Sequence, residues 1–173
     1  MSLKLAIDVF YDGDTAFAGG LLFRSWTDST PVRSSVTVHE HCSPYVPDEF
    51  FRRELPPILS LLDTFSESVD TILVDGYVWL NDSTTPGLGA YLFDALGQTT
   101  PVIGVARNPY QRSSAATEVC RGESEQSLYI TSVGVNEDYA AEFVRQMHGP
   151  YRTPTLLMLA DRLGRDHAVP AQG

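Results

Sequence analysis

Three short segments near the start of the chain are rich in apolar and β-forming residues and predict strands over 3–11, 17–26 and 32–41. Asp12-Gly13, between the first two segments, is a strong signal for a two-residue hairpin turn. In the third segment, valines alternate with polar neighbours, which is typical of an antiparallel strand with one solvated face. The opening of the chain therefore predicts an antiparallel meander of three strands.

The hydrophobic period then changes from that of a strand to that of a helix. Apolar residues spaced by four, three, four and three positions place one face of a helix against the core; they are Phe51, Leu55, Ile58, Leu62 and Phe65. Pro56 and Pro57 interrupt this pattern, because proline lacks an amide donor and clashes with the preceding turn. We expect a short turn over 48–54 and a main helix that begins at about Pro56.

An apolar run over 71–75 closes on Asp75-Gly76, as buried parallel strands often do before a functional loop. A helix around 88–96 separates this run from a similar strand over 101–106. The pattern predicts a β-α-β unit whose loops lie at one edge of the sheet.

The second half of the chain begins with a polar stretch over 108–125, expected to be mobile, which is followed by a predicted strand over 128–133. Asn136 is a typical helix N-cap, and Gly149-Pro150 is a typical stop. The buried stripe of this helix is expected to be Tyr139, Ala140, Phe143, Val144 and Met147. A last helix is expected to begin at Pro154.

No repeat or linker divides the sequence, so residues 1–173 are expected to form a single domain. An antiparallel meander followed by β-α-β units, with helices on both faces of a mixed sheet, is the element order of a ribonuclease H-like α/β domain. Other mixed α/β folds share this order and stay open on this ground alone.

The composition of the chain indicates a folded globular protein and argues against a membrane protein or a cysteine-based zinc site. With 43% hydrophobic and 20% charged residues, the chain has the composition of a folded globular protein. Because the chain has no apolar run of roughly 18 residues and starts with a strand pattern rather than a signal-peptide core, we expect no membrane span and a cytoplasmic location. We also expect a monomer. The two cysteines are far apart and have no zinc-binding spacing.

The net charge of −10 argues against binding nucleic acid through a broadly basic surface. Lys4 is the one lysine, but many arginines fall late in the sequence, so a local basic strip stays open. These are Arg107, Arg112, Arg121, Arg145, Arg152, Arg162 and Arg165.

Asp8 and Asp75 are the first candidates for chemistry. Asp8 interrupts an apolar strand, where an ionised carboxylate is costly unless it is paired, hydrogen-bonded or bound to metal. Taken singly, Asp8 can lie on a solvated strand face, and Asp75 can serve as a turn or helix cap. In a ribonuclease H-like sheet, however, the two become neighbours, and paired carboxylates are the oxygen ligands that Mg²⁺ requires.

Six short motifs, in order along nearly the whole chain, give this sequence a specific resemblance to the endonuclease V family. They are Ala6-Ile7-Asp8-Val9, Pro44-Tyr45-Val46-Pro47, Phe51-Arg52-Arg53-Glu54, Val74-Asp75-Gly76, Ile103-Gly104-Val105-Ala106, and Tyr151-Arg152-x-Pro154 with Ala160-Asp161. The family cleaves nucleic acid near deoxyinosine in DNA and, in some members, near inosine in RNA.

The resemblance implies a ribonuclease H-like fold and a Mg²⁺-dependent endonuclease of DNA repair, with Mn²⁺ as a substitute. It places Asp8, Glu54 and Asp75 on the family's metal-binding carboxylates and Asp161 on an acidic or histidine position near the same metal. It also implies that the loop Pro44-Tyr45-Val46-Pro47 is a wedge that enters the duplex beside the lesion. Two prolines stiffen such a loop, and the Tyr45 ring can stack where a base has been turned out.

Gly76 and Gly89 are further candidates, since glycine lets backbone approach an extruded base closely. Arg107 stands where the family typically has a lysine, and a guanidinium can clamp a phosphate there. The loop 77–81 lacks the family's usual histidines, and Met158 replaces a basic residue of the last helix. These departures leave two alternatives open, a ribonuclease H-like nuclease with another substrate and a non-catalytic nucleic-acid-binding protein.

Overall fold

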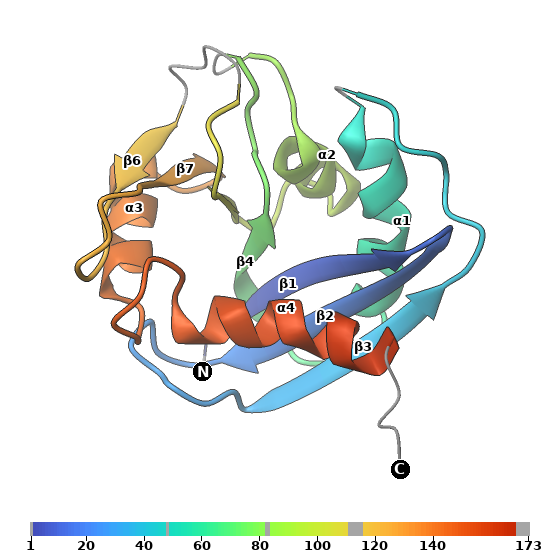
Figure 1. Ribbon diagram of the computed structural model, residues 1–173, viewed down its shortest axis with the longest axis horizontal. Helices are drawn as coiled ribbons and strands as arrows, with labels where there is room; N and C mark the ends of the chain where they lie inside the picture. Colours follow the sequence, from blue (N-terminus) through green and yellow to red (C-terminus); the bar gives the residue numbers. More distant parts are fainter. Residues whose placement is uncertain (1, 48, 82–83, 111–115, 169–173) are drawn as a thin grey trace.

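A seven-stranded mixed sheet forms the centre of the protein, and helices cover both of its faces (Figure 1). The computed structural model describes residues 2–47, 49–81, 84–110 and 116–168. The strands are β1 (Leu3–Asp12), β2 (Thr15–Phe23), β3 (Arg33–His39), β4 (Val69–Asp75), β5 (Val102–Ala106), β6 (Thr117–Val119) and β7 (Leu128–Val133). The helices are α1 (Phe50–Leu62), α2 (Leu88–Ala95), α3 (Glu137–Gln146) and α4 (Thr155–Ala168). The strand order is β3-β2-β1-β4-β5-β7-β6, which confirms the predicted mixed α/β architecture.

The predicted meander is present, because β1 pairs with β2 and β2 with β3, both antiparallel. Gly13 makes the hairpin between β1 and β2 with a φ of +62°, a conformation that favours glycine. β2 ends at Phe23, three residues before the predicted boundary. The cause is a local turn, in which the Asp28 carboxylate accepts hydrogen bonds from the amides of Arg24 and Ser25.

The predicted β-α-β unit is confirmed: β4 pairs in parallel with β1 and with β5, and α2 connects β4 to β5. Consequently β1, β4 and β5 all end at the same edge of the sheet. β7 and β6 then extend the sheet in antiparallel pairing.

The prediction for the first helix was wrong. α1 begins at Phe50 and continues through Pro56 and Pro57 to Leu62, without a separate turn before the prolines; residue 48 lies outside the described part. Ile58 and Leu61 are almost fully buried beneath the sheet. This tertiary burial offsets the two missing amide donors, a contribution that local propensity leaves out.

Two expectations for the second half need correction. No strand was predicted in the polar stretch 108–125, but it contains β6. It also contains the buried side chain of Arg121, whose guanidinium donates hydrogen bonds to carbonyl oxygens of the segment 147–152. Residues 111–115 lie outside the described part. Asn136 caps α3 as predicted, accepting hydrogen bonds from two backbone amides. Tyr139, predicted to be buried, is 66% exposed because it projects from the outer face of α3.

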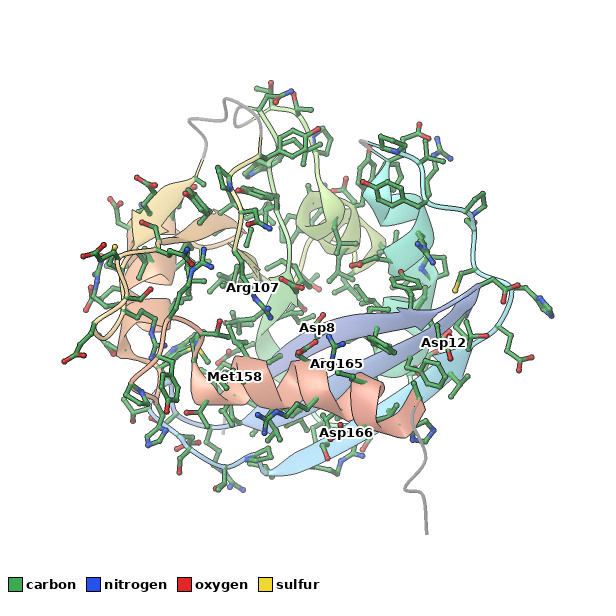
Figure 2. The ribbon with its side chains drawn as sticks, in the orientation of Figure 1. Asp8, Asp12, Arg107, Met158, Arg165 and Asp166 are labelled. Atoms are coloured by element: carbon green, nitrogen blue, oxygen red, sulfur yellow. The ribbon has the colours of Figure 1, made fainter. Side chains whose placement is uncertain are left out.

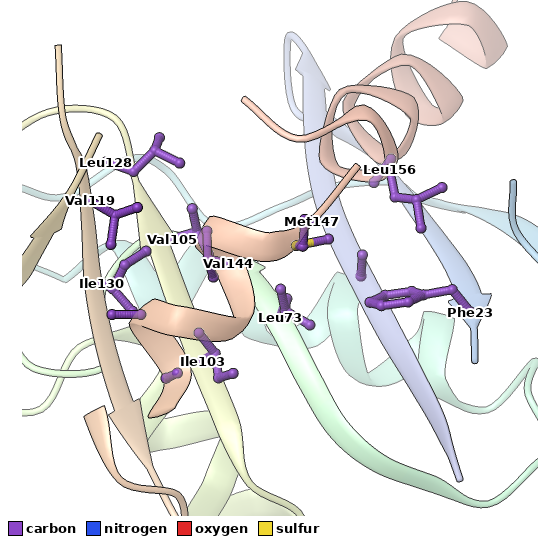
Figure 3. Packing of buried hydrophobic residues seen from close by; sticks show 14 of the residues in the cluster. Phe23, Leu73, Ile103, Val105, Val119, Leu128, Ile130, Val144, Met147 and Leu156 are labelled. Carbon is purple, nitrogen blue, oxygen red and sulfur yellow. The ribbon is translucent and has the colours of Figure 1, made fainter. Parts of the chain in front are cut away.

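Each face of the sheet carries its own hydrophobic core. One core joins the sheet to α3 and α4 (Figure 3), and the other joins it to α1 and α2. α4 lies close to β1 and β2 because both sides of the contact are glycine: a Cβ on Gly164 would lie 2.4 Å from the Phe17 carbonyl oxygen, and one on Gly19 would lie 2.7 Å from Leu163 Cβ. This close packing sets the position of every side chain that α4 presents to the sheet edge. No helix within the described residues has the length and apolarity required to cross a bilayer.

Candidate active site

The site forms where β1 and β4 run side by side. Ile7 is in register with Val74, so Asp8 and Asp75 follow as neighbours on the two parallel strands. Asp8 accepts a 2.8 Å hydrogen bond from the Val9 amide, and a side-chain hydrogen bond links it to Asp75. The parallel register therefore brings together two carboxyl groups that are far apart in the sequence.

Two helices on opposite faces of the sheet add further carboxylates. Glu54 comes from α1 and is only 6% exposed. Asp161 comes from α4, where its carboxylate pairs with Arg165 at 3.2 Å, and the Arg165 guanidinium lies over the ring of Phe10 on β1. Both helices thus direct an acidic side chain toward the strands that carry Asp8 and Asp75.

The four carboxyl groups interact electrostatically. Burial, followed by the charges of Asp75 and Asp161, raises the pKa of Asp8 to about 8. Burial raises the pKa of Glu54 well above its ordinary value, and Asp75 and Asp8 raise it further. Ionising these carboxyl groups together is therefore unfavourable unless a cation compensates their charges.

Asp75 keeps part of its surface open to solvent, yet packed protein atoms surround most of its carboxyl group. This desolvation raises the pKa of Asp75 and the charge of Asp161 adds to the rise, whereas Arg107 and the hydrogen bond with Asp8 lower it. Figure 2 shows Arg107 beside Asp8, and its charge lowers the pKa of that residue as well. Arg107 offsets only part of the negative charge.

The chemistry of this donor set fits a hard divalent cation, which prefers carboxylate oxygens. A small cavity of about 20 Å³ lies beside Asp8, Asp75 and Arg107, enough room for one water molecule or a small ion. Glu54 does not line this cavity. Within the described residues, no three Asp, Glu, His or Cys side chains are already arranged as a metal site, so binding an ion requires the carboxylates to draw together.

A second cavity, of about 550 Å³, opens directly onto Asp75 and Arg107. Aromatic rings of Tyr45, Phe51, Tyr77 and Tyr110 contribute to its lining. The Tyr77 hydroxyl donates a 2.5 Å hydrogen bond to the Asn108 carbonyl oxygen, and the rings of Tyr77 and Tyr110 lie 6.0 Å apart. Flat apolar walls of this kind suit a planar heterocyclic base.

The predicted wedge loop lies at this cavity. The four residues from Pro44 to Pro47 are all exposed in the segment between β3 and α1. Tyr45, 57% exposed, and Pro47 line the cavity, whereas Pro44 and Val46 do not. The loop therefore presents a partly open aromatic ring beside the carboxyl groups.

The two predicted glycines differ in what they contact. Gly76 lines the aromatic cavity and has a φ of +143°, which other residues rarely adopt. Gly89 does not line it; instead, it lets α2 pack on Val78, since a Cβ there would lie 2.5 Å from Val78 Cγ2. Sequence inspection missed Gly87, which lines the cavity and where a Cβ would lie 2.6 Å from the Tyr77 carbonyl oxygen.

Sequence inspection also missed the support behind Glu54. The Arg53 guanidinium lies 3.8 Å from the centre of the Tyr11 ring, and its charge lowers the pKa of Glu54. The buried Tyr11 hydroxyl has no hydrogen-bond partner among the described residues. Nothing in the local sequence signals this contact, because the two residues come from β1 and α1.

Comparison with known proteins identifies the family. The sequence profile of endonuclease V matches residues 3–135. Endonuclease V of Pyrococcus abyssi is 31% identical over 169 residues, covering 92% of this chain and 77% of that protein. Endonuclease V of Streptomyces avermitilis is 32% identical over 181 residues, with the same coverage of 92% and 77%.

Solved structures agree on the fold. The Streptomyces avermitilis endonuclease V structure aligns with a TM-score of 0.78 at 24% identity, covering 100% of this chain and 84% of that one. Endonuclease V of Ciona intestinalis, in complex with a 24mer DNA containing an inosine followed by a ribo-adenosine, aligns with a TM-score of 0.81 at 15% identity, covering 96% and 85%. The ribonuclease H-like fold that the motif resemblance implies is confirmed. Sequence profile, curated relatives and fold agree, and this chain belongs to the endonuclease V family.

Proposed function

We propose that this protein is a metal-dependent endonuclease that hydrolyses a phosphodiester near deoxyinosine in DNA, with a role in DNA repair. The observation that carries the proposal is the continuity of the site: the aromatic cavity opens onto Asp75 and Arg107, and the same two residues line the small cavity beside Asp8. A turned-out base and the backbone phosphate that follows it require such adjoining spaces. The inosine-containing DNA bound to the Ciona intestinalis relative supports the choice of substrate.

Asp8, Glu54, Asp75 and Asp161 would hold Mg²⁺, or Mn²⁺ as a substitute. Bound there, the ion supplies Lewis-acid activation of the phosphoryl group and of the attacking water. The water oxygen forms a new bond to phosphorus, and the bond from phosphorus to the 3′ oxygen breaks. The 3′ oxygen takes up a proton, and the products are a 3′-hydroxyl and a 5′-phosphate.

The chain's own residues position these groups. Arg107 lines both cavities and would donate hydrogen bonds to the phosphate oxygens as their negative charge grows. The hydrogen bond of Asp8 to the Val9 amide holds one carboxylate oxygen in place. Tyr45 would stack in the gap left in the duplex, while Gly76 lets the backbone border the base closely.

The test is cleavage of labelled DNA and RNA oligonucleotides that contain inosine, uracil, a mismatch or a flap, with Mg²⁺, Mn²⁺ or EDTA. We expect metal-dependent nicking of inosine-containing DNA. Asp75→Asn should abolish nicking and keep the fold, because it removes a negative ligand without changing volume. Asp12→Asn, the same change at an exposed position of β1, should retain activity.

Other outcomes identify the alternatives. Equal metal-dependent cutting of every substrate would replace inosine specificity with a general ribonuclease H-like nuclease. Binding without cutting under any condition would indicate a non-catalytic nucleic-acid-binding protein. Full activity of Asp75→Asn would remove Asp75 from the mechanism.

A further inference from the structure

A third cavity, of about 360 Å³, lies between α4 and the segment that leads into it. Arg107 lines this cavity as well as the two already described, so the three form a continuous series along the sheet edge. Met158 and Arg162 contribute from α4 and, being four residues apart, share one face of the helix. Figure 2 shows Met158 on the part of α4 that lies over the strand carrying Asp8.

The cavity is cationic, although the chain carries a net charge of −10. Arg107, Arg152 and Arg162 line it, together with one acid, Asp161. The Asp161 carboxylate pairs with Arg165 at 3.2 Å, which offsets part of its charge. The Arg152 guanidinium is committed to the carbonyl oxygens of Ser127 and Arg107, which leaves Arg107 and Arg162 to meet a ligand.

Few cationic side chains in the described part of the chain lack both a hydrogen bond and an ion pair. Across the described ranges, the lysine and arginine side chains that have neither a hydrogen bond nor an ion pair are Arg24, Arg107 and Arg162. Arg107 lies near Asp8 and Asp75 and lowers the pKa of both, but it forms no ion pair or hydrogen bond with either. Two of these three side chains line the same cavity.

An aromatic ring completes the site. Tyr151 lines the cavity and is 66% exposed. The backbone of Tyr151 is held in place by the buried Arg121 guanidinium, which donates a 2.6 Å hydrogen bond to the Tyr151 carbonyl oxygen. Unpaired guanidinium groups with an adjacent exposed ring are the elements that bind single-stranded nucleic acid, the cation meeting phosphate and the ring stacking on a base.

We propose that this cavity binds the sugar-phosphate backbone of the strand as it continues past the cleavage site, on the side of the carboxyl groups away from Tyr45. Arg162 contacts a phosphate, and Tyr151 stacks on the adjoining base. This inference rests on the proposed function and adds a second contact region to it. It also explains how an acidic protein holds nucleic acid without a broad basic face.

The test is fluorescence anisotropy of a labelled single-stranded inosine oligonucleotide in EDTA, measured over a series of salt concentrations. Arg162→Gln should weaken binding by about five- to tenfold at low salt and lower the slope of log affinity against log salt by about 0.7, the value of one phosphate contact on a single strand. Arg145→Gln is the matched control, since that exposed arginine pairs with Glu142 on α3 outside the cavity, and it should bind like the unmodified protein. Tyr151→Leu should weaken binding while leaving the salt slope unchanged.

A relocated charge gives a positive test. Met158→Arg in the Arg162→Gln background returns a guanidinium to the same cavity and should restore most of the affinity and the salt slope. Thermal unfolding of each variant separates lost binding from lost folding. Unchanged affinity and slope in Arg162→Gln would overturn this site while the proposed function stands, whereas a native protein that binds no oligonucleotide would overturn both.

Discussion

Replacing Asp8 by Asn should stabilise the metal-free protein while abolishing its activity. Asp8 has a folded pKa of about 8 against an ordinary value of 3.8, because burial and the charges of Asp75 and Asp161 disfavour its ionised form. A carboxyl group with a raised folded pKa contributes its full stability below the ordinary pKa. That contribution is lost as the pH rises through the folded pKa. The native protein should therefore lose stability between about pH 4 and pH 8 relative to the variant.

The expected gain in stability of Asp8→Asn follows from the difference between the folded and the ordinary pKa of Asp8. Raising a carboxyl pKa from 3.8 to about 8 corresponds to roughly 6 kcal/mol at high pH, at 1.36 kcal/mol for each tenfold change in proton affinity. Asp8 shares its proton and its repulsion with Asp75, so removing one member relieves only part of this cost. We expect Asp8→Asn to raise the free energy of unfolding by about 2–4 kcal/mol above pH 8, or Tm by roughly 5–15 °C for a chain of this length.

The assay is thermal unfolding in EDTA at pH 5 and pH 9, compared with Asp12→Asn as a control on the same strand at an exposed position. The advantage of Asp8→Asn should be small at pH 5 and large at pH 9, and Asp12→Asn should show little change at either pH. Mg²⁺ at pH 8 should raise the Tm of the native protein and raise that of Asp8→Asn much less. A variant less stable than the native protein at pH 9, or an advantage independent of pH, would refute the reasoning.

Three further changes test other parts of the site. Tyr45→Ala should reduce cleavage of an inosine-containing duplex about five- to a hundredfold more than cleavage of a single strand, because stacking fills a gap only in the duplex; an unchanged ratio would show that the loop is only a rigid turn. Gly164→Ala should lower stability by about 1–3 kcal/mol in urea unfolding, since the new Cβ would lie 2.4 Å from the Phe17 carbonyl oxygen, and a gain would show that α4 shifts freely. Tyr11→Phe should raise Tm in EDTA by removing a buried hydroxyl without a partner in the described structure, whereas a loss of about 1–2 kcal/mol would reveal a hidden hydrogen bond to Glu54.

The elements that sequence predicted well are those fixed by local pattern. Alternation and the Asp12-Gly13 turn predict the meander, and two apolar runs around a helix predict the parallel unit. Given that topology, the neighbourhood of Asp8 and Asp75 follows, since Asp8 comes directly after the last β1 residue paired with β4 and Asp75 ends β4. The start of α1 could not be predicted in this way. The two prolines in the sequence indicate a local cost to the helix, and the tertiary burial of Ile58 and Leu61 overrides that cost.

The parts that sequence could not predict depend on contacts between distant segments. Gly87 rather than Gly89 borders the aromatic cavity because of how α2 meets the loop after β4. Likewise, the sequence counts arginines without indicating which of them are paired. Arg152, Arg162 and Arg165 cannot be told apart from the sequence. In the structure, Arg152 is bound to carbonyl oxygens and Arg165 to a carboxylate.

This distinction resolves the conflict between a net charge of −10 and a nucleic-acid substrate. Most described cations bind neighbouring carboxylates or carbonyl oxygens, whereas the side chains of Arg107 and Arg162 have neither a hydrogen bond nor an ion pair and line one cavity together with Asp161. A phosphate chain is therefore attracted along one narrow path and repelled by the acidic surface elsewhere, which favours correct placement over tight binding. Binding a divalent cation would strengthen this preference, because it reverses the local charge at Asp8 and Asp75 and leaves the rest of the surface unchanged.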